Sequence, residues 1–202
     1  MAWGALERDD TGRYHVGLRL WEVGSLAPRG TPLREVALPF LEDLYVVTRE
    51  NVQLAVREDT EVVFVERIAG RSAVPVLTRV GGRFSLHATG VGLVLLAHAP
   101  TEILERIIAD GLTAYTPATI NDPTHLRRVL AQVRRDGYAI SRGAVTPDAV
   151  SVAAPITDAR GAVVAAVSLV VALEGARPAA LAPVVRTAAR GISRAYAGTA
   201  NT

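Results

Sequence analysis

The segment from Arg79 to Ala97, RVGGRFSLHATGVGLVLLA, contains the residues best suited to binding a small ligand. Gly81 and Gly82 near its start can adopt positive φ and so indicate a turn. The apolar run from Val91 to Ala97 predicts a short helix that begins just after Thr89-Gly90. Because the first N–H groups of a helix have no intrahelical acceptor, this helix start offers hydrogen-bond donors to a ligand.

A serine interrupts the longest apolar run, Ala162 to Leu173, which predicts a buried strand. Ser168 and Val170 are two residues apart, so their side chains lie on the same face of that strand. A buried hydroxyl without a partner costs about 1–3 kcal/mol, so a buried Ser168 needs a hydrogen bond. Either the hydroxyl bonds a nearby carbonyl in a purely structural role, or it belongs to a binding site.

The sequence predicts no catalytic centre, no metal site and no cofactor. The four histidines are scattered, and none has the spacing of metal ligands. No G-x-S-x-G, P-loop or H-E-x-x-H motif occurs. We expect a ring nitrogen of His87 to bond the backbone at the turn. A Ser–His–Asp site is assembled in space, so a small α+β enzyme acting on an organic acid stays open as an alternative.

Composition limits the class of protein. Half of the residues are apolar, which is enough for a core, and the absence of cysteine excludes disulfides, thiolate catalysis and zinc sites built on sulfur. The 22 basic residues, all arginine, face 20 acidic ones, so the net charge of +2 does not indicate a polyanion-binding surface. We find no signal-peptide pattern, and the longest apolar run is too short to cross a bilayer. We therefore expect a soluble, cytoplasmic protein with no membrane partner.

The order of the predicted elements indicates an α+β fold, with helices flanking an antiparallel sheet and no βαβ rhythm. Predicted strands cover 51–57, 60–68, 73–78, 138–142, 150–157 and 162–173. Predicted helices cover 32–44, with Thr31 as N-cap, then 91–97, 101–110, 123–136 and 176–196.

The first residues predict a hairpin followed by a helix. Leu6 to Gly17 contains two short strands around an Asp-Asp-Thr-Gly turn, and Leu18 to Ser25 begins a helix that 27–30 should break. A free hairpin of this size is marginally stable, so we expect it to belong to a larger domain. The hairpin contains Arg8 and Arg13, and Arg19 follows it. These arginines either contact phosphates or are solvated surface charges.

The Arg79–Ala97 segment resembles the G-R-x-P-L-H-A-T-x-x-G-K-x-L-L-A segment of the IclR family of bacterial transcription regulators. Ser85 stands where the family usually has Pro, and Leu93 stands where it usually has Lys. The resemblance extends over most of the chain, from about Leu6 to Gly198. On this basis the chain is identified as a member of the family.

The resemblance implies two parts. Residues 1–30 would be a remnant of the DNA-binding wing and a linker helix, and residues 31–198 a GAF-like effector-binding domain. The recognition helix of the winged helix-turn-helix is missing, so we expect either that residues are missing before Met1 or that the start was assigned late. The resemblance further implies a homodimer or homotetramer, acting as repressor or activator, that contacts operator DNA only through the missing N-terminal domain. Effector binding would favour one arrangement of subunits and so shift operator affinity.

The resemblance also implies the residues that bind a small organic acid effector. Positions that contact small carboxylates in relatives match Gly90, Val91, Ser141, Ser151, Ser168 and Val170. Here Ser141 replaces an acidic residue, Val170 replaces a hydroxyl, and Arg142-Gly143-Ala144 replaces an acidic pair. We therefore expect a less polar pocket and a larger, partly apolar acid, aromatic or branched. A free-standing metabolite-binding module without a DNA role is a further alternative.

Overall fold

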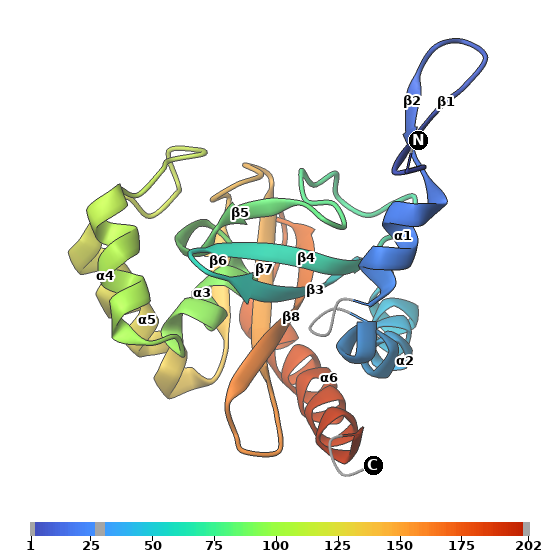
Figure 1. Ribbon diagram of the computed structural model, residues 1–202. Coiled ribbons are helices and arrows are strands. Elements are labelled where there is room, and N and C mark those ends of the chain that lie inside the picture. The colour runs from blue at the N-terminus through green and yellow to red at the C-terminus, as the bar shows by residue number, and fades with distance from the viewer. Residues whose placement is uncertain (1–2, 27–30, 200–202) are drawn as a thin grey trace.

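A six-stranded antiparallel sheet forms the centre of the protein (Figure 1), described here in a computed structural model over residues 3–26 and 31–199. The strands lie in the order β5-β4-β3-β8-β7-β6. Their bounds are β3 (Asn51–Glu58), β4 (Glu61–Ile68), β5 (Arg83–Ser85), β6 (Ala139–Arg142), β7 (Ala149–Thr157) and β8 (Val163–Ala172). The two longest hairpins, β3–β4 and β7–β8, meet where β3 pairs with β8. The predicted α+β architecture on an antiparallel sheet is confirmed.

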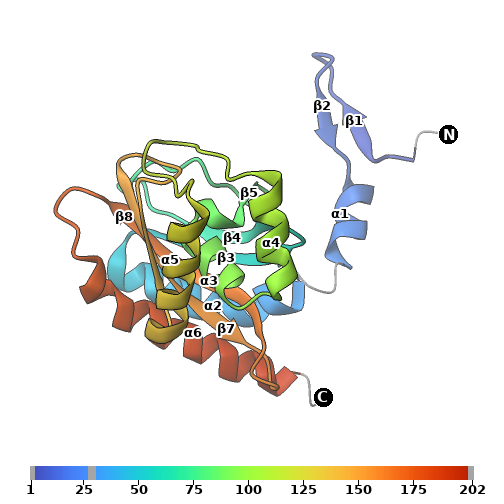
Figure 2. The ribbon, with the colours of Figure 1, turned by 90° about the vertical axis from the view of Figure 1, so that its left-hand side faces the viewer.

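Helices cover both faces of the sheet (Figures 1 and 2). On one face lie α2 (Thr31–Thr48) and α6 (Pro178–Thr199), which pack against each other and onto β7 and β3. The other face carries η1 (Leu86–Ala88), α3 (Gly90–Ala97), α4 (Thr101–Asp110) and α5 (Pro123–Asp136). The predicted break at 27–30 and the capping side chain of Thr31 lie outside what the structure describes.

The alternation of side chains along the strands explains why both faces are covered. In β8, Val167 and Leu169 point into the core under α2 and α6, whereas Ala166 points into the core under α3. The strands thus supply apolar side chains to two separate clusters, one on each face of the sheet. Burying apolar surface is favourable, so helices cover both faces.

The helix α5 shows how local sequence sets its limits. The carboxylate of Asp122 accepts the N–H of His125 at the first turn, and Gly137 ends the helix at φ 72°, in the left-handed region. The arginines of its outer face also have structural partners: Arg127 pairs with Glu105 of α4, and Arg134 donates to the carbonyl of Ala97 at 2.9 Å. These contacts join α5 to α4 and to the end of α3.

The prediction of a strand at 73–78 is wrong. Residues 71–80, which we call the strap, form no strand, and β5 at Arg83–Ser85 instead pairs with Glu61–Val63 of β4. The strap crosses the face of β3 and is held there by side chains rather than by a ladder. Asn51 donates to the carbonyl of Val74 at 2.9 Å, and Pro75 has no N–H to give to a neighbouring strand.

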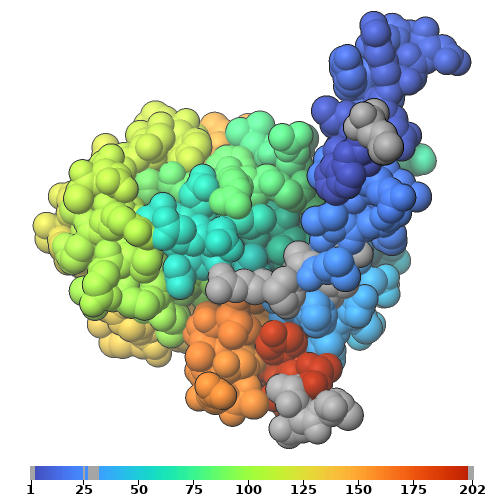
Figure 3. Space-filling view, viewed as in Figure 1, coloured from blue at the N-terminus to red at the C-terminus, as the bar shows by residue number. Residues whose placement is uncertain are grey.

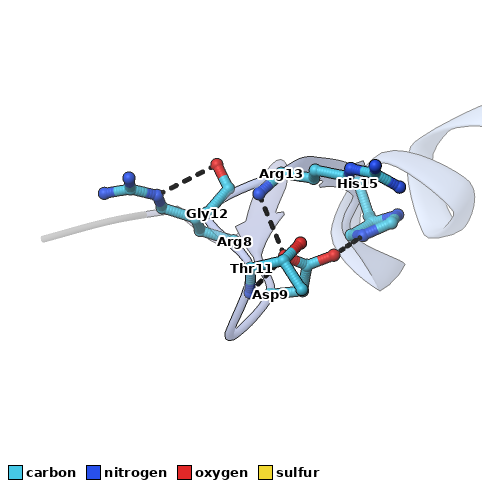
Figure 4. A network of polar contacts seen from close by, with 6 residues as sticks. All are labelled: Arg8, Asp9, Thr11, Gly12, Arg13 and His15. Atoms are coloured by element: carbon cyan, nitrogen blue, oxygen red, sulfur yellow. Dashed lines mark hydrogen bonds and ion pairs between the residues drawn. The ribbon is translucent and has the colours of Figure 1, made fainter.

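The first elements stand away from the sheet (Figures 1 and 2), and in the space-filling view the hairpin projects from the rest of the molecule (Figure 3). They are the hairpin of β1 (Leu6–Arg8) and β2 (Tyr14–Val16), followed by α1 (Leu18–Ser25), as predicted from the sequence. One carboxylate organises the turn (Figure 4): Asp9 accepts the backbone N–H groups of Thr11 and Arg13, and its other oxygen lies 2.7 Å from Nε2 of His15. The hydrogen bond with His15, helped by those from Thr11 and Arg13, lowers the pKa of Asp9 to about 2.

Among the described helices, none combines the length and the apolar character needed to span a bilayer.

The crossing of α2 and α6 predicts that Gly191→Ala is destabilising. A Cβ at Gly191 would lie 2.6 Å from Cε1 of Phe40, closer than any normal contact. Such overpacking costs about 1–3 kcal/mol, more than the gain in helix propensity. Urea unfolding measures the effect.

The matched control is Gly198→Ala in the same helix, where a Cβ meets nothing within 4 Å. We expect this variant to be as stable as the wild type or slightly more stable. A Gly191→Ala variant that is equally stable would contradict the packing described here.

Candidate functional site

A cavity of about 50 Å³ lies between the start of α3 and the sheet face beneath it. The floor comes from β3, β7 and β8, and the walls come from the strap and from the loop 143–146. Five of the six residues predicted to bind the effector line it: Gly90, Val91, Ser141, Ser151 and Val170. The structure thus brings these five together, while their role in binding stays a prediction.

The register of the sheet explains why distant residues meet here. Val170 of β8 is paired with Asn51 of β3 on one side and Ser151 of β7 on the other, and Ser151 is paired with Ser141 of β6. Residues paired in this way point to the same face of the sheet. The next row contains Gln53, Ser168 and Ala153 in the same order of strands.

The start of α3 sits directly on β7. Thr89 caps the helix, accepting the N–H of Gly92 at its hydroxyl (3.0 Å) and that of Leu93 at its carbonyl (2.8 Å). Gly90 and Val91, the first two residues of the helix, have no intrahelical acceptor for their N–H groups. A Cβ at Gly90 would lie 2.6 Å from Oγ of Ser151, so only glycine allows this close approach.

The sixth predicted residue, Ser168, lies behind the cavity. Its side chain is fully buried, and it does not belong to the cavity lining. Its hydroxyl lies 3.5 Å from Oε1 of Gln53 and donates to it. Gln53, which does line the cavity, donates from Nε2 to Oγ1 of Thr78 in the strap at 2.6 Å.

Sequence reasoning missed Gln53 and Thr78. The available signal was the pair Asn51 and Gln53, two amides at alternate positions of the otherwise apolar stretch 51–56. Side chains at that spacing share one face, and two buried amides on one face need polar partners. For Asn51 these partners are the Val74 carbonyl and the guanidinium of Arg67, whose Nη2 donates to Oδ1 at 2.8 Å. The strap and the floor of the cavity are therefore connected by polar side chains.

Two threonines hold the opposite wall. Thr116 donates to the carbonyl of Gly143 at 2.7 Å, and Thr119 donates to that of Ala144 at 2.6 Å. Gly143 has a φ of 63°, in the left-handed region, where the chain turns at the end of β6. The Thr-rich loop before α5 thus positions the wall that follows β6.

The cavity lining carries no charged side chain among the described residues. Its polar groups are hydroxyls, the Gln53 amide and peptide groups, and the rest is apolar. A bound anion would therefore be stabilised by N–H and O–H dipoles rather than by a cation. Nor does the described part of the chain contain a group of three or more His, Cys, Asp or Glu side chains that could hold a metal ion.

His87 has a structural environment. Its Nε2 donates to the carbonyl of Thr113 at 3.0 Å. The expected bond to the backbone is present, but its acceptor lies in the loop after α4 and not at the turn beside His87. Nδ1 has no partner among the described residues. Burial lowers the pKa of His87, and the bond to Thr113 offsets this only in part. The ring is therefore neutral, and it lies outside the cavity lining.

The contact between Gly90 and Ser151 predicts that Gly90→Ala destabilises the protein. The new methyl group would overlap Ser151, and overpacking of this kind costs about 1–3 kcal/mol. Denaturant unfolding of Gly90→Ala, Ser151→Ala and the double variant forms a complete cycle.

Because Ser151→Ala removes the oxygen that the methyl would meet first, we expect the double variant to be more stable than the sum of the two single effects. Strictly additive effects would show that the two residues do not touch.

The environment of His87 predicts a pH-dependent stability. Its folded-state pKa is lower than the ordinary value of 6.5, so the unfolded chain binds a proton first as the pH falls. The free energy of unfolding should be fully maintained above pH 6.5 and should decrease as the pH falls through the lower folded-state pKa.

We expect His87→Gln, which keeps an N–H donor but does not titrate, to reduce the difference between urea midpoints at pH 7.5 and 5.5. His125→Gln, at an exposed position in α5, is the control and should leave that difference unchanged. An unchanged difference in His87→Gln would contradict the assignment.

Comparison with known proteins identifies the family. Residues 27–194 match the family described as bacterial transcriptional regulator IclR C-terminal. The chain is 34% identical over 197 residues to the HTH-type transcriptional regulator BhcR of Paracoccus denitrificans, an alignment that covers 95% of this chain and 71% of that protein. It is 33% identical over 159 residues to the HTH-type transcriptional repressor AllR of Escherichia coli, covering 78% of this chain and 59% of the repressor. The chain thus spans less than two thirds of the length of AllR.

Solved structures of similar proteins show the same fold. An IclR homolog of Microbacterium hydrocarbonoxydans, complexed with 4-hydroxybenzoate, is 40% identical with a TM-score of 0.91, over 96% of this chain and 80% of that one. The IclR protein of Thermotoga maritima is 29% identical with a TM-score of 0.83, again over 96% and 80%. The chain therefore belongs to the IclR family of bacterial transcriptional regulators, and it carries the C-terminal effector-binding domain of that family.

Proposed function

We propose that the cavity under α3 binds a small organic acid and that this binding modulates the affinity of a longer regulator for its operator DNA. The observation that carries the proposal is an uncharged cavity lined by Gly90 and Val91, the first two residues of α3, whose N–H groups have no intrahelical acceptor. The 4-hydroxybenzoate complex of the Microbacterium protein supports it, because that protein is 40% identical over nearly the whole chain.

The carboxylate would lie at the start of α3. The N–H groups of Gly90 and Val91 donate to it, and the hydroxyl of Ser151, which lies against Gly90, adds a third donor. The partial positive charge of the helix N-terminus favours an anion at this position. Ser141 and Val170, which flank Ser151 in the same row of the sheet, complete the floor, and Ser168 contributes indirectly through Gln53.

The remaining wall favours a partly apolar acid. Phe64, Val76 and Val145 line the cavity together with the two valines predicted from the sequence. The volume of about 50 Å³ is smaller than the roughly 150 Å³ that holds benzene in an engineered cavity. An aromatic or branched acid therefore requires the strap to move outward. No strand ladder opposes this movement, and the side-chain hydrogen bonds to Val74 and Thr78 leave Val76 between them as the part of the wall that can yield.

We infer the other parts of the function from the family resemblance. Residues 1–30 would be the wing and linker of the DNA-binding domain, and residues 31–198 the effector-binding domain of a cytoplasmic homodimer or homotetramer. The exposed hairpin, with Arg8 and Arg13 at its surface, suits a position beside DNA phosphates. We infer ligand binding rather than turnover. His87, the histidine nearest in sequence to the cavity, is bonded to the carbonyl of Thr113 and does not line the cavity, so it is not placed to act as a catalytic base there.

A titration with matched ligands tests the proposal. We expect benzoate, 4-hydroxybenzoate, 4-methylbenzoate or a branched acid to bind the wild type more tightly than glyoxylate or pyruvate in isothermal titration calorimetry. Benzamide, which has the shape of benzoate but no charge, should bind at least tenfold more weakly. Because a hydrogen bond to a charged group is worth about 1.5–3 kcal/mol, Ser151→Ala should weaken binding about tenfold or more.

Thr124→Ala is the matched control, since it removes an exposed hydroxyl at the start of α5, outside the cavity. It should bind each acid like the wild type. Failure of every acid to bind would overturn the proposed site. Tighter binding of glyoxylate or pyruvate than of the larger acids would overturn the proposed size and polarity of the effector.

A further inference from the structure

We propose that Gln53 determines which acids bind, by forming a hydrogen bond with a second polar group at the end of the effector opposite the carboxylate. This inference rests on the proposed function, because it assumes that the carboxylate lies at the start of α3. The effector class is then an acid with a hydroxyl or carbonyl group at its far end, rather than a purely hydrocarbon acid.

The position of Gln53 in the sheet suits this role. Gly90 lies over Ser151 and Ala153 of β7, whereas Gln53 belongs to β3, with β8 between the two strands. Neighbouring strands are about 4.8 Å apart, so the backbone of Gln53 lies roughly 10 Å across the floor from that of β7. Both ends of the floor face the same cavity. A molecule of the length of a substituted benzoate can contact α3 and Gln53 at once.

Gln53 also has hydrogen-bonding capacity left. An amide side chain offers two N–H donors and an oxygen with two lone pairs. Nε2 makes one hydrogen bond, to Thr78 at 2.6 Å, and Oε1 accepts one bond at the long distance of 3.5 Å from Ser168. The side chain is only 3% exposed, so bulk water does not reach it freely. A ligand that ends in a polar group can use this remaining capacity, and one that ends in a methyl group leaves it unfilled.

The neighbours of Gln53 fix the direction of its amide. Thr78 holds the nitrogen from the strap, and Ser168 holds the oxygen from β8. This arrangement gives Ser168 a function even though it does not line the cavity: it orients the group that meets the ligand. It also places the specificity contact beside the strap, the wall that must move to admit a larger acid.

Two ligands of nearly equal size provide the test. In isothermal titration calorimetry with the full chain, 4-hydroxybenzoate should bind the wild type about tenfold more tightly than 4-methylbenzoate, which is the value of one buried hydrogen bond. Gln53→Met, which keeps the length of the side chain, should bring this ratio close to one. Its affinity for benzoate should stay within about threefold of the wild type, which shows that the variant is folded and that the carboxylate site is intact.

Thr78→Val is the second variant. It removes the hydroxyl that holds the nitrogen of Gln53 but leaves the amide in place, so the preference for 4-hydroxybenzoate should fall below tenfold without disappearing. A ratio that stays near ten in Gln53→Met, a ratio near one in the wild type, or an undiminished preference in Thr78→Val would each overturn the proposed contact or its orientation. In all three cases benzoate still binds, so the proposed function survives; failure of every acid to bind the wild type would instead overturn the proposed function itself.

Discussion

The close contact between α3 and β7 is the constraint on which the rest of the site depends. Gly90 lies so near Ser151 that any side chain would overlap it, and Thr89 caps the helix at the same point. This close approach places Gly90 and Val91, the first two residues of α3, in the lining of the cavity beside Ser151 of β7 and Val170 of β8. Position 92 also requires glycine, since a Cβ there would lie 2.2 Å from the Leu86 carbonyl oxygen. The chemistry of the site thus follows from backbone packing as much as from side chains.

The two faces of the sheet differ in the polarity of their buried side chains. The face under α2 and α6 is apolar along every central strand, with fully buried side chains such as Leu54, Val152 and Leu169. The other face contains an apolar cluster under α3 and α5 and, beside it, buried polar side chains in two neighbouring rows, among them Asn51, Gln53 and Ser168. Buried polar groups are tolerable when they bond each other, and here the partners come from the strap, from Arg67 and from adjacent strands. Apolar burial elsewhere offsets the cost of desolvating these side chains.

An uncharged cavity has consequences for regulation. In the proposed function an anion is recognised by peptide and hydroxyl dipoles, whose effect depends on their orientation, so small shifts of α3 or of the strap would change the affinity strongly. Among the described residues, the side chains of Asn51 and Gln53 bond the strap to β3 on the far side of the cavity, whereas Thr116 and Thr119 hold the opposite wall. A ligand that enlarges the cavity would therefore displace the strap rather than the opposite wall. A ligand shifts a conformational equilibrium only by its difference in affinity between the two states, and the strap is where that difference can arise.

The sequence by itself determined the class of fold, most element limits and the family, because apolar periodicity, caps and the Arg79–Ala97 motif are local properties of the chain. Through family resemblance it also indicated six residues as members of one pocket, and five of them line the cavity; the six are Gly90, Val91, Ser141, Ser151, Ser168 and Val170. Only the tertiary structure decided that Ser168 lies behind Gln53, that Gln53 and Thr78 face the cavity, and that 73–78 is a strap rather than a strand. The physical reason is that a short β-rich segment becomes a strand only if a sheet edge is free to pair with it. In this protein β5 occupies the edge of β4, and the polar side chains of β3 bind the segment across the face of the sheet instead.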